Sequence, residues 1–184
     1  SEPEGHFVGF EVDGEIGSLN IYNEIAYLSG TDKITMPGSY QGNLLKNYFM
    51  NVLGINYRFK NNLKITVEHL FNGLGDSSNL DASNIRYKNG LNKSLNEHVT
   101  GISLNYEFNP LLIGKYDSKI AWQDSSHQHN ITLIKSITDN LDFILGSQIN
   151  IGDRPSGSNW QNPNIQSEFG RQNNKYFFQL KSYF

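Results

Sequence analysis

The sequence predicts an all-β fold, an antiparallel transmembrane β-barrel of the outer-membrane type formed by residues 1–184. Two observations lead to this prediction. Apolar and polar residues alternate with a period of two in segments of about ten residues, which is the length that a tilted strand needs to cross a bilayer. The connections between these segments are alternately short and long, as are the periplasmic turns and extracellular loops of such barrels.

The composition indicates an ordered chain with extensive polar surfaces. The mean hydropathy is -0.51 and 37% of the 184 residues are hydrophobic, which is low for a domain with an ordinary core. Disorder does not explain this polarity, because 12% of the residues are aromatic and only 18% are charged. The net charge of -3 provides no basic footprint, so we expect no nucleic-acid partner.

Nine segments show the alternation, and each of them has one apolar and one polar side. In the third segment, for example, Leu53, Ile55 and Tyr57 alternate with Gly54 and Asn56. Such a pattern is typical of strands that separate an apolar from a polar environment. The predicted strands are 7–16, 19–27, 49–59, 63–71, 102–108, 112–122, 131–137, 141–151 and 174–184.

The connections sort by length. Gly and Asn tolerate positive φ and Asp or Asn initiates turns, so four connections are tight turns by their chemistry. They are Gly17-Ser18, Asn61-Asn62, Asn109-Pro110 and Asp139-Asn140. The intervening connections are 29–46, 73–96, 153–167 and a shorter one at 124–127. A soluble β-sandwich has no reason to sort its turns by end, so the sorting favours a barrel.

The last segment, NKYFFQLKSYF, resembles the C-terminal signature of bacterial outer-membrane β-barrel proteins, a strand with alternate apolar residues and a terminal Phe. Tyr176, Phe178, Leu180 and Phe184 fit this signature, while Ser182 stands where the pattern prefers an apolar residue. The resemblance implies that the four fitting residues form the assembly signal that the barrel assembly machinery recognises. It also implies contact with outer-membrane lipid and a location in the cell outer membrane.

Other parts of the chain are similar to hairpins of large porin-like barrel proteins, namely 52–73, 103–112, 138–152 and the SEFG sequence at 167–170. This similarity identifies an architecture rather than a transported solute. An intact bacterial barrel has an even number of strands. Since the predicted number is odd, we expect the chain to be the C-terminal part of a larger barrel. One miscounted segment would instead restore an even number and a closed barrel of about eight or ten strands.

Charged and polar residues on the polar sides of the strands form the candidate pore lining. They are Glu11, Asp13, Glu15, Glu24, Arg58, Lys64, Glu68, Glu107, Lys115, Asp117, Lys119 and Gln148. Because rings of charge set ion selectivity, the sequence favours a porin-like channel for passive diffusion of small polar solutes or ions. Alternatively, opposite charges pair across strands and fill the interior. The barrel would then sheath a periplasmic or lumenal partner protein, or display its extracellular loops.

We expect neither catalytic residues nor a cofactor. Ser125, Ser126 and His127 form the only compact cluster of hydroxyl and imidazole groups, and nothing in the sequence specifies the geometry of a catalytic triad. Glu68 and His69 are neighbours in a predicted strand. Their side chains therefore point to opposite faces and cannot act together as an acid and a base.

We also expect no metal site. His127 and His129 are two residues apart, so their rings share one face of a strand, and Asp124 is the nearest additional ligand. A solvated histidine pair in a loop at the rim is the simpler interpretation. Asp76 and Asp81 lie in a long connection that lacks the spacing of an EF-hand, so a solvated loop is again the simpler interpretation.

Overall fold

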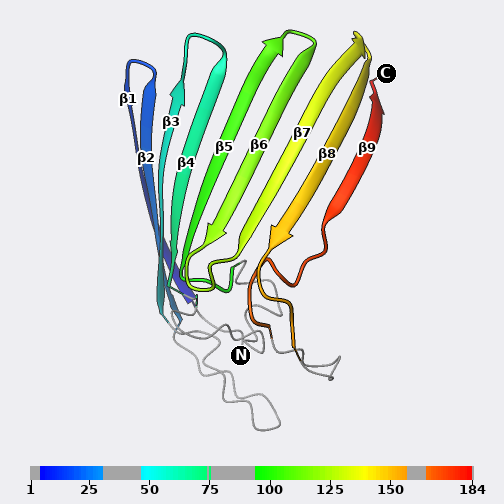
Figure 1. Ribbon diagram of the computed structural model, residues 1–184. Helices are drawn as coiled ribbons and strands as arrows, with labels where there is room; N and C mark the ends of the chain where they lie inside the picture. Colours follow the sequence, from blue (N-terminus) through cyan, green and yellow to red (C-terminus); the bar gives the residue numbers. More distant parts are fainter. Residues whose placement is uncertain (1–4, 31–46, 74, 76–93, 157–164, 184) are drawn as a thin grey trace.

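The computed structural model describes residues 5–30, 47–73, 75, 94–156 and 165–183. These residues form one antiparallel sheet of nine strands, and each strand pairs with its neighbours in the sequence (Figure 1). The strands are β1 (Gly5–Ile16), β2 (Leu19–Gly30), β3 (Tyr48–Arg58), β4 (Leu63–Asn72), β5 (His98–Asn109), β6 (Leu112–Ala121), β7 (His127–Thr138), β8 (Leu141–Ile151) and β9 (Lys175–Ser182). The prediction of an all-β antiparallel fold is confirmed for the described residues.

The four predicted tight turns are confirmed, and all of them lie at the same end of the sheet (Figure 1). Gly17 and Asn62 have positive φ values of 62° and 66°, as their turns require. The other connections join the strands at the opposite end. Within the described part of the chain there is no helix long and apolar enough to cross a membrane.

Some strand boundaries differ from the prediction. β5 and β7 begin at His98 and His127, several residues before their predicted starts. Their first residues include His and Thr, which hide the alternation because neither residue is clearly apolar. β9 ends at Ser182, and the Tyr183 amide then donates to the Asn140 carbonyl at 3.0 Å. The predicted final residue of this strand, Phe184, lies outside the described residues.

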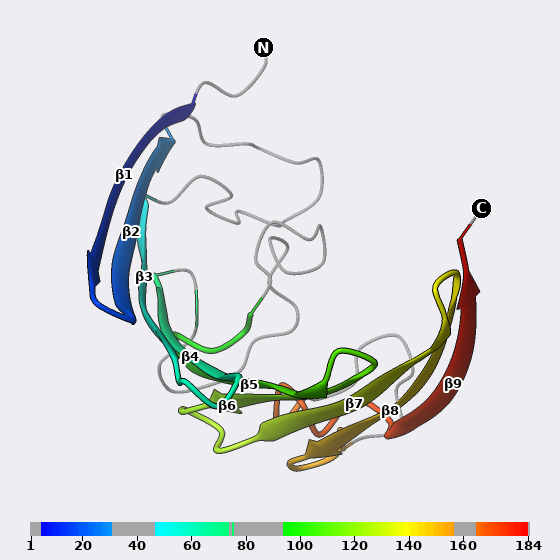
Figure 2. The same cartoon turned by 90° about the horizontal axis from the view of Figure 1, so that it is seen from above.

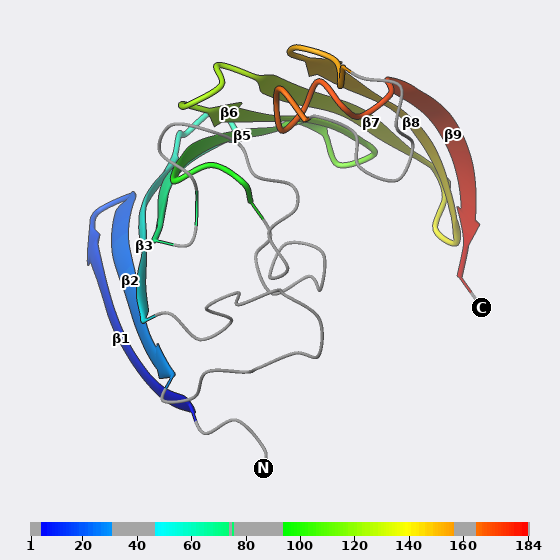
Figure 3. The ribbon, with the colours of Figure 1, turned by 90° about the horizontal axis from the view of Figure 1, so that it is seen from below.

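The sheet is strongly curved but does not close into a barrel. Seen along the strands, it forms an arc with β1 at one end and β9 at the other (Figures 2 and 3). Among the described residues, β1 pairs only with β2, and β9 pairs only with β8. Both edge strands run in the same direction, because the chain passes from β1 to β9 through eight antiparallel pairings.

The register gives the sheet one apolar and one polar face. Ile21, Ile55, Val67 and Ile102 lie side by side across four strands, and successive rows on this face are similar. Segments 94–97 and 165–172 lie on the concave side of the arc (Figure 2), where the polar side chains are. The apolar face is therefore the convex one. The described chain leaves most of this face uncovered. Leu53, for example, is 49% exposed.

Glycines on the concave face make room for aromatic rings. Tyr22 lies beside Gly54 in the register and reaches across it to donate a hydrogen bond to Glu68 on β4. A Cβ atom on Gly54 would lie 2.1 Å from the Tyr22 ring. Phe177 covers Gly146 in the same manner, with a Cβ approach of 2.3 Å. These rings fill space that a second layer would fill in an ordinary core.

Substitution of Gly54 by Ala tests this arrangement. The new methyl group must displace the Tyr22 ring and break its hydrogen bond to Glu68, so we expect the free energy of unfolding to fall by about 1–3 kcal/mol. Gly101 lies in the same cross-strand row, and a Cβ atom added to it would have no neighbouring atom within 4 Å, so Gly101→Ala is the matched control. Urea-induced unfolding of the two variants measures the difference. Equal unfolding midpoints would contradict the proposed packing.

Candidate functional site

The cross-strand register places the whole candidate pore lining on the concave face. Directly paired residues point to the same face of a sheet. Glu11 pairs with Glu24, and Arg58 pairs with Lys64. The register of the other strands places the remaining members on this same face. These residues therefore share the concave face, and their role in lining a pore stays a prediction.

One row of this face brings opposite charges near each other. From β3 to β7 it contains Gly54, Glu68, Gly101, Lys119 and Gln128 in direct register. The acidic and the basic residue are thus separated by a glycine on the strand between them. This row forms the middle of the candidate site.

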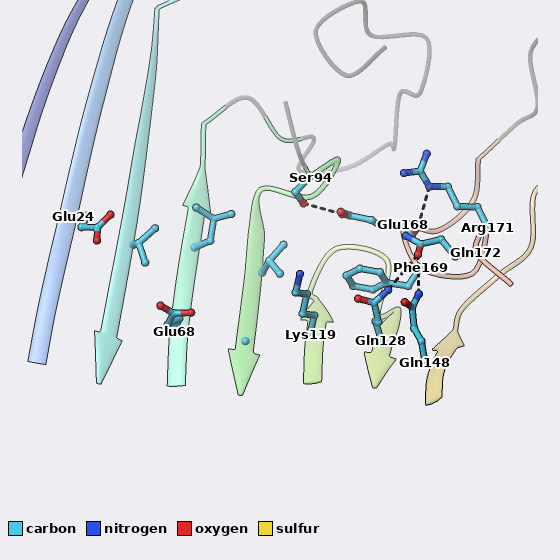
Figure 4. Close-up of a pocket in the computed structure, with 14 residues that line it drawn as sticks. Glu24, Glu68, Ser94, Lys119, Gln128, Gln148, Glu168, Phe169, Arg171 and Gln172 are labelled. Carbon is cyan, nitrogen blue, oxygen red and sulfur yellow. Dashed lines mark hydrogen bonds between the residues drawn. The ribbon is translucent and has the colours of Figure 1, made fainter. Parts of the chain in front are cut away.

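A hollow of about 660 Å³ lies over this part of the concave face. Figure 4 shows Glu24 and Glu68 on one side of it, and Lys119, Gln128 and Arg171 on the other. Desolvation lowers the pKa of the Arg171 guanidinium below its ordinary value of 12.5, and the group stays charged at neutral pH. The apolar residues that line the hollow are Val52, Leu70, Val99 and Phe169.

A network of carboxamides borders the basic side of the hollow. The Oε1 atom of Gln172 accepts hydrogen bonds from the Nε2 atoms of Gln128 at 3.2 Å and Gln148 at 3.1 Å (Figure 4). Both Nε2 atoms also donate to Asn150 Oδ1. The network attaches segment 165–172 to β7 and β8, which explains how Arg171 comes to lie over the concave face.

Three connections meet in a buried polar cluster, here called the loop clamp, formed by Ser94, Asn96, Asp124, Ser126 and Glu168. The Oε2 atom of Glu168 accepts from Ser94 Oγ at 2.8 Å and from Asn96 Nδ2 at 2.7 Å. It also accepts from the backbone amides of Leu95 and Asn96, at 3.2 and 3.3 Å. Four donors around one carboxylate oxygen compensate for the burial of its charge.

Asp124 completes the loop clamp. Its Oδ2 atom accepts from the Glu168 amide at 2.7 Å and from Asn96 Nδ2 at 3.1 Å. Ser126 Oγ accepts from the Phe169 amide at 3.2 Å. Asn96 and Ser126 are fully buried, and Phe169 is 5% exposed. The loop clamp therefore joins the β4–β5, β6–β7 and β8–β9 connections into one unit.

The loop clamp was not predicted from the sequence. Its members are short polar residues in connections that are distant from each other along the chain, and such residues are abundant in solvated loops. The SEFG sequence at 167–170 was the available indication, because it places a carboxylate next to an aromatic residue within a polar stretch. Its resemblance to porin-like proteins did not indicate that Glu168 is buried.

The histidine pair has a different setting from the one predicted. His127 and His129 belong to β7 rather than to a loop, and their rings stack with centroids 6.2 Å apart on the convex face. Tyr116 Oη lies 2.9 Å from His129 Nδ1. Asp124, the nearest additional ligand in the sequence, belongs to the loop clamp.

Among the described residues, no group of three or more His, Cys, Asp or Glu side chains is arranged to hold a metal ion. Asp76 and Asp81 lie outside these residues.

The Ser-Ser-His cluster is also divided by the structure. Ser126 is part of the loop clamp, while His127 stacks on His129 on the other face. Glu68 and His69 point to opposite faces, as predicted. His69 Nδ1 lies 2.9 Å from Thr100 Oγ1, and His69 Nε2 lies 3.2 Å from His98 Nδ1.

Three of the four predicted assembly residues lie on the convex face of the last strand. Tyr176, Phe178 and Leu180 are 74%, 77% and 62% exposed, and each has an uncovered side chain beside β8. Phe184, the fourth, lies outside the described residues. The exposure agrees with an apolar surface that faces something other than the described chain.

Comparisons with known proteins assign no family to this chain. No protein-family model, curated protein or solved structure matches it. The function is therefore argued from the geometry of the two faces of the sheet and from the residues of the hollow.

The loop clamp leads to a prediction about Glu168. Replacing it by Ala leaves the buried Leu95 amide without its acceptor, which costs about 1–3 kcal/mol. We expect the Leu95 amide to exchange its hydrogen roughly tenfold faster or more, measured by hydrogen-exchange mass spectrometry. Glu97→Ala is the control, because this neighbour makes no side-chain hydrogen bond in the described structure. Unchanged exchange in the Glu168 variant would refute the role of the loop clamp.

Proposed function

We propose that the chain forms part of the wall of an outer-membrane β-barrel that allows passive, porin-like diffusion of small polar solutes or ions. The observation that carries this proposal is the division of one curved sheet into an exposed apolar convex face and a charged concave face. Lipid requires an exposed apolar face, and a water-filled passage permits a charged face. Outer-membrane lipid and the barrel assembly machinery are the partners that the C-terminal signature implies.

The convex face supports a membrane-spanning position, because aromatic rings lie near the tight turns. Tyr57 and Phe59 pack edge to face with ring centroids 4.6 Å apart, and Tyr106 and Phe108 do so at 4.7 Å. Aromatic girdles of this kind occur where a barrel passes from lipid to headgroups.

A second aromatic band lies at the other end of the same strands. The ring centroid of Phe71 lies 5.9 Å from that of Phe49 and 5.3 Å from that of His98. The Trp122 indole donates to Thr100 Oγ1 at 2.8 Å. Aromatic rings that carry polar atoms suit a headgroup region, because the ring can contact lipid chains on one side and water on the other.

The separation of the two bands fits a bilayer. From Phe49 to Phe59 the chain advances ten residues, or about 33 Å at ~3.3 Å per residue. A strand tilt of ~40° reduces this to about 25 Å along the membrane normal, which equals the usual height of the apolar band of outer-membrane barrels. Between the bands the rows contain aliphatic residues such as Ile55, Val67 and Ile102.

The contacts of the concave face favour a hydrated passage over a filled interior. Its carboxylates bind neutral donors: Tyr22 donates to Glu68, and Ser103 donates to Asp117 at 2.6 Å. None of the lysines in the described strands forms an ion pair with a carboxylate within 4.0 Å. Charges without close partners are stable where water solvates them.

The open edges support a larger barrel. Since β1 and β9 run in the same direction, closing the sheet edge to edge would create one parallel pairing. Closure with antiparallel pairing throughout requires an odd number of additional strands. Bacterial single-chain barrels have even strand numbers, so a sheet of nine strands fits as part of such a barrel.

A structural barrel that sheaths a partner protein or displays loops is the second candidate function. One observation favours it, because segment 165–172 is held against the concave face by the carboxamide network and occupies part of the space there. Conductance measurements separate the two functions.

The facing of the strands can be tested with arginine substitutions. Leu53→Arg places a charge on the convex face, and we expect it to destabilise the protein folded in lipid by about 2–4 kcal/mol near the bilayer midplane. The control is Asn56→Arg on the same strand, whose side chain faces the concave side and should cost far less. Folding into vesicles can be titrated with urea. Equal costs at the two positions would contradict a lipid-facing convex surface.

The passage itself can be tested by single-channel recording of the full-length protein in planar bilayers. Acidic residues are concentrated on β1. Joint substitution of Glu11→Gln, Asp13→Asn and Glu15→Gln should shift the permeability ratio roughly twofold toward anions at low salt, where screening is weak. Lys135→Gln, which removes a charge from the convex face, should leave the ratio unchanged. A folded protein that conducts no ions would refute the channel and favour the structural barrel.

A further inference from the structure

We propose that the hollow on the concave face binds zwitterionic solutes, which carry an ammonium group at one end and a carboxylate at the other. This inference rests on the proposed function, because it names the class of solute that the passage selects. It is carried by the arrangement of Glu68 and Lys119 around Gly101, together with the apolar residues beside them.

The two charged residues lie on either side of an open floor, which is the uncovered part of the sheet at Gly101. Glu68, Gly101 and Lys119 lie in register on β4, β5 and β6. Strands are ~4.8 Å apart, so the backbones of the two charged residues are roughly 10 Å from each other. A Cβ atom on Gly101 would have no neighbouring atom within 4 Å. The space between the acidic and the basic side chain is therefore available to a ligand.

Neither charge is neutralised by the other. Lys119 makes no hydrogen bond or ion pair among the described residues. Glu68 accepts a hydrogen bond at Oε1 from Tyr22, which reaches it across Gly54 from the side opposite to Lys119. This contact holds the carboxylate in place and leaves its second oxygen for a cation.

The chemistry of the walls selects a dipolar ligand over a singly charged one. An ammonium group finds acceptors in Glu68 and Glu24, and a carboxylate finds a donor in Lys119. Glu168 also lines the hollow, and its charge is bound by the donors of the loop clamp. A simple cation or anion is attracted by one wall and repelled by the other, so the two effects offset each other. A zwitterion aligned across the hollow gains from both walls. Methylene groups between its charges can contact Leu70 and Val99, which lie in the neighbouring row on β4 and β5.

The experiment uses 6-aminohexanoate as the probe, because its two charges are separated by a flexible apolar chain. Full-length protein in planar bilayers is exposed to this probe, to hexanoate or to hexylamine, and the block of ionic current is measured. We expect 6-aminohexanoate to block at the lowest concentration. Glu68→Gln and Lys119→Gln should each weaken this block about fivefold, as expected for loss of one exposed ion pair. Lys135→Gln, whose side chain lies on the convex face, is the control.

Two further variants make the result specific. Exchanging the charges with Glu68→Lys and Lys119→Glu should retain part of the block, because a zwitterion can bind these two residues in the reverse orientation while Glu24 and Arg171 keep the original polarity. Gly101→Val should remove the block without changing any charge, since it fills the open floor. A block that is equal for all three probes, or one that survives both Glu68→Gln and Lys119→Gln, would overturn the proposed site while leaving the channel intact.

A failure of the channel can be distinguished from a failure of the site. If the folded protein conducts no ions, binding of 6-aminohexanoate is measured by isothermal titration calorimetry on the full-length protein in detergent. Binding that Lys119→Gln weakens would then support the site and contradict the channel. Absence of binding would refute the site.

Discussion

The structure depends on the pairing of every strand with its sequence neighbours in one continuous antiparallel register. Backbone N–H and C=O groups must be satisfied wherever water is excluded, and strand pairing does this without using any side chain. The side chains are then free to differ completely between the two faces. A shift of one residue in any pairing would exchange the faces of that strand, so Ile55 would turn toward the charges and Asn56 toward the convex side. The apolar convex face and the charged concave face are both consequences of this register.

Curvature gives the two faces unequal space, and small residues respond to it. On the concave side, Gly54 and Gly146 leave room for the rings of Tyr22 and Phe177, which cross the sheet instead of projecting from it. Gly101 has no such ring above it. The same residue type therefore has two roles on this face, since it accommodates an aromatic ring at two positions and leaves an open floor at the third.

The architecture was largely predictable from the sequence, because alternation and turn chemistry are local properties. The turns at Gly17 and Asn62 and the facing of the candidate pore lining follow from them directly. The starts of β5 and β7 were missed because His98 and His127 do not register as apolar, although they lie on the convex face. The loop clamp could not be predicted. It depends on which distant connections meet, and nothing near Glu168 in the sequence specifies Ser94 as its partner.

The loop clamp connects the architecture to the site. Glu168 and Asp124 bind backbone amides from separate connections, so polar contacts hold segment 165–172 in place together with the buried side chains of Leu95 and Phe169. This segment then supplies Arg171 and Gln172 to the basic side of the hollow. The acidic side, by contrast, consists of Glu24 and Glu68 on strands and needs no loop to position it. The difference implies that changes in the loop clamp displace Arg171 and Gln172, while Lys119 on β6 and the acidic side stay in place.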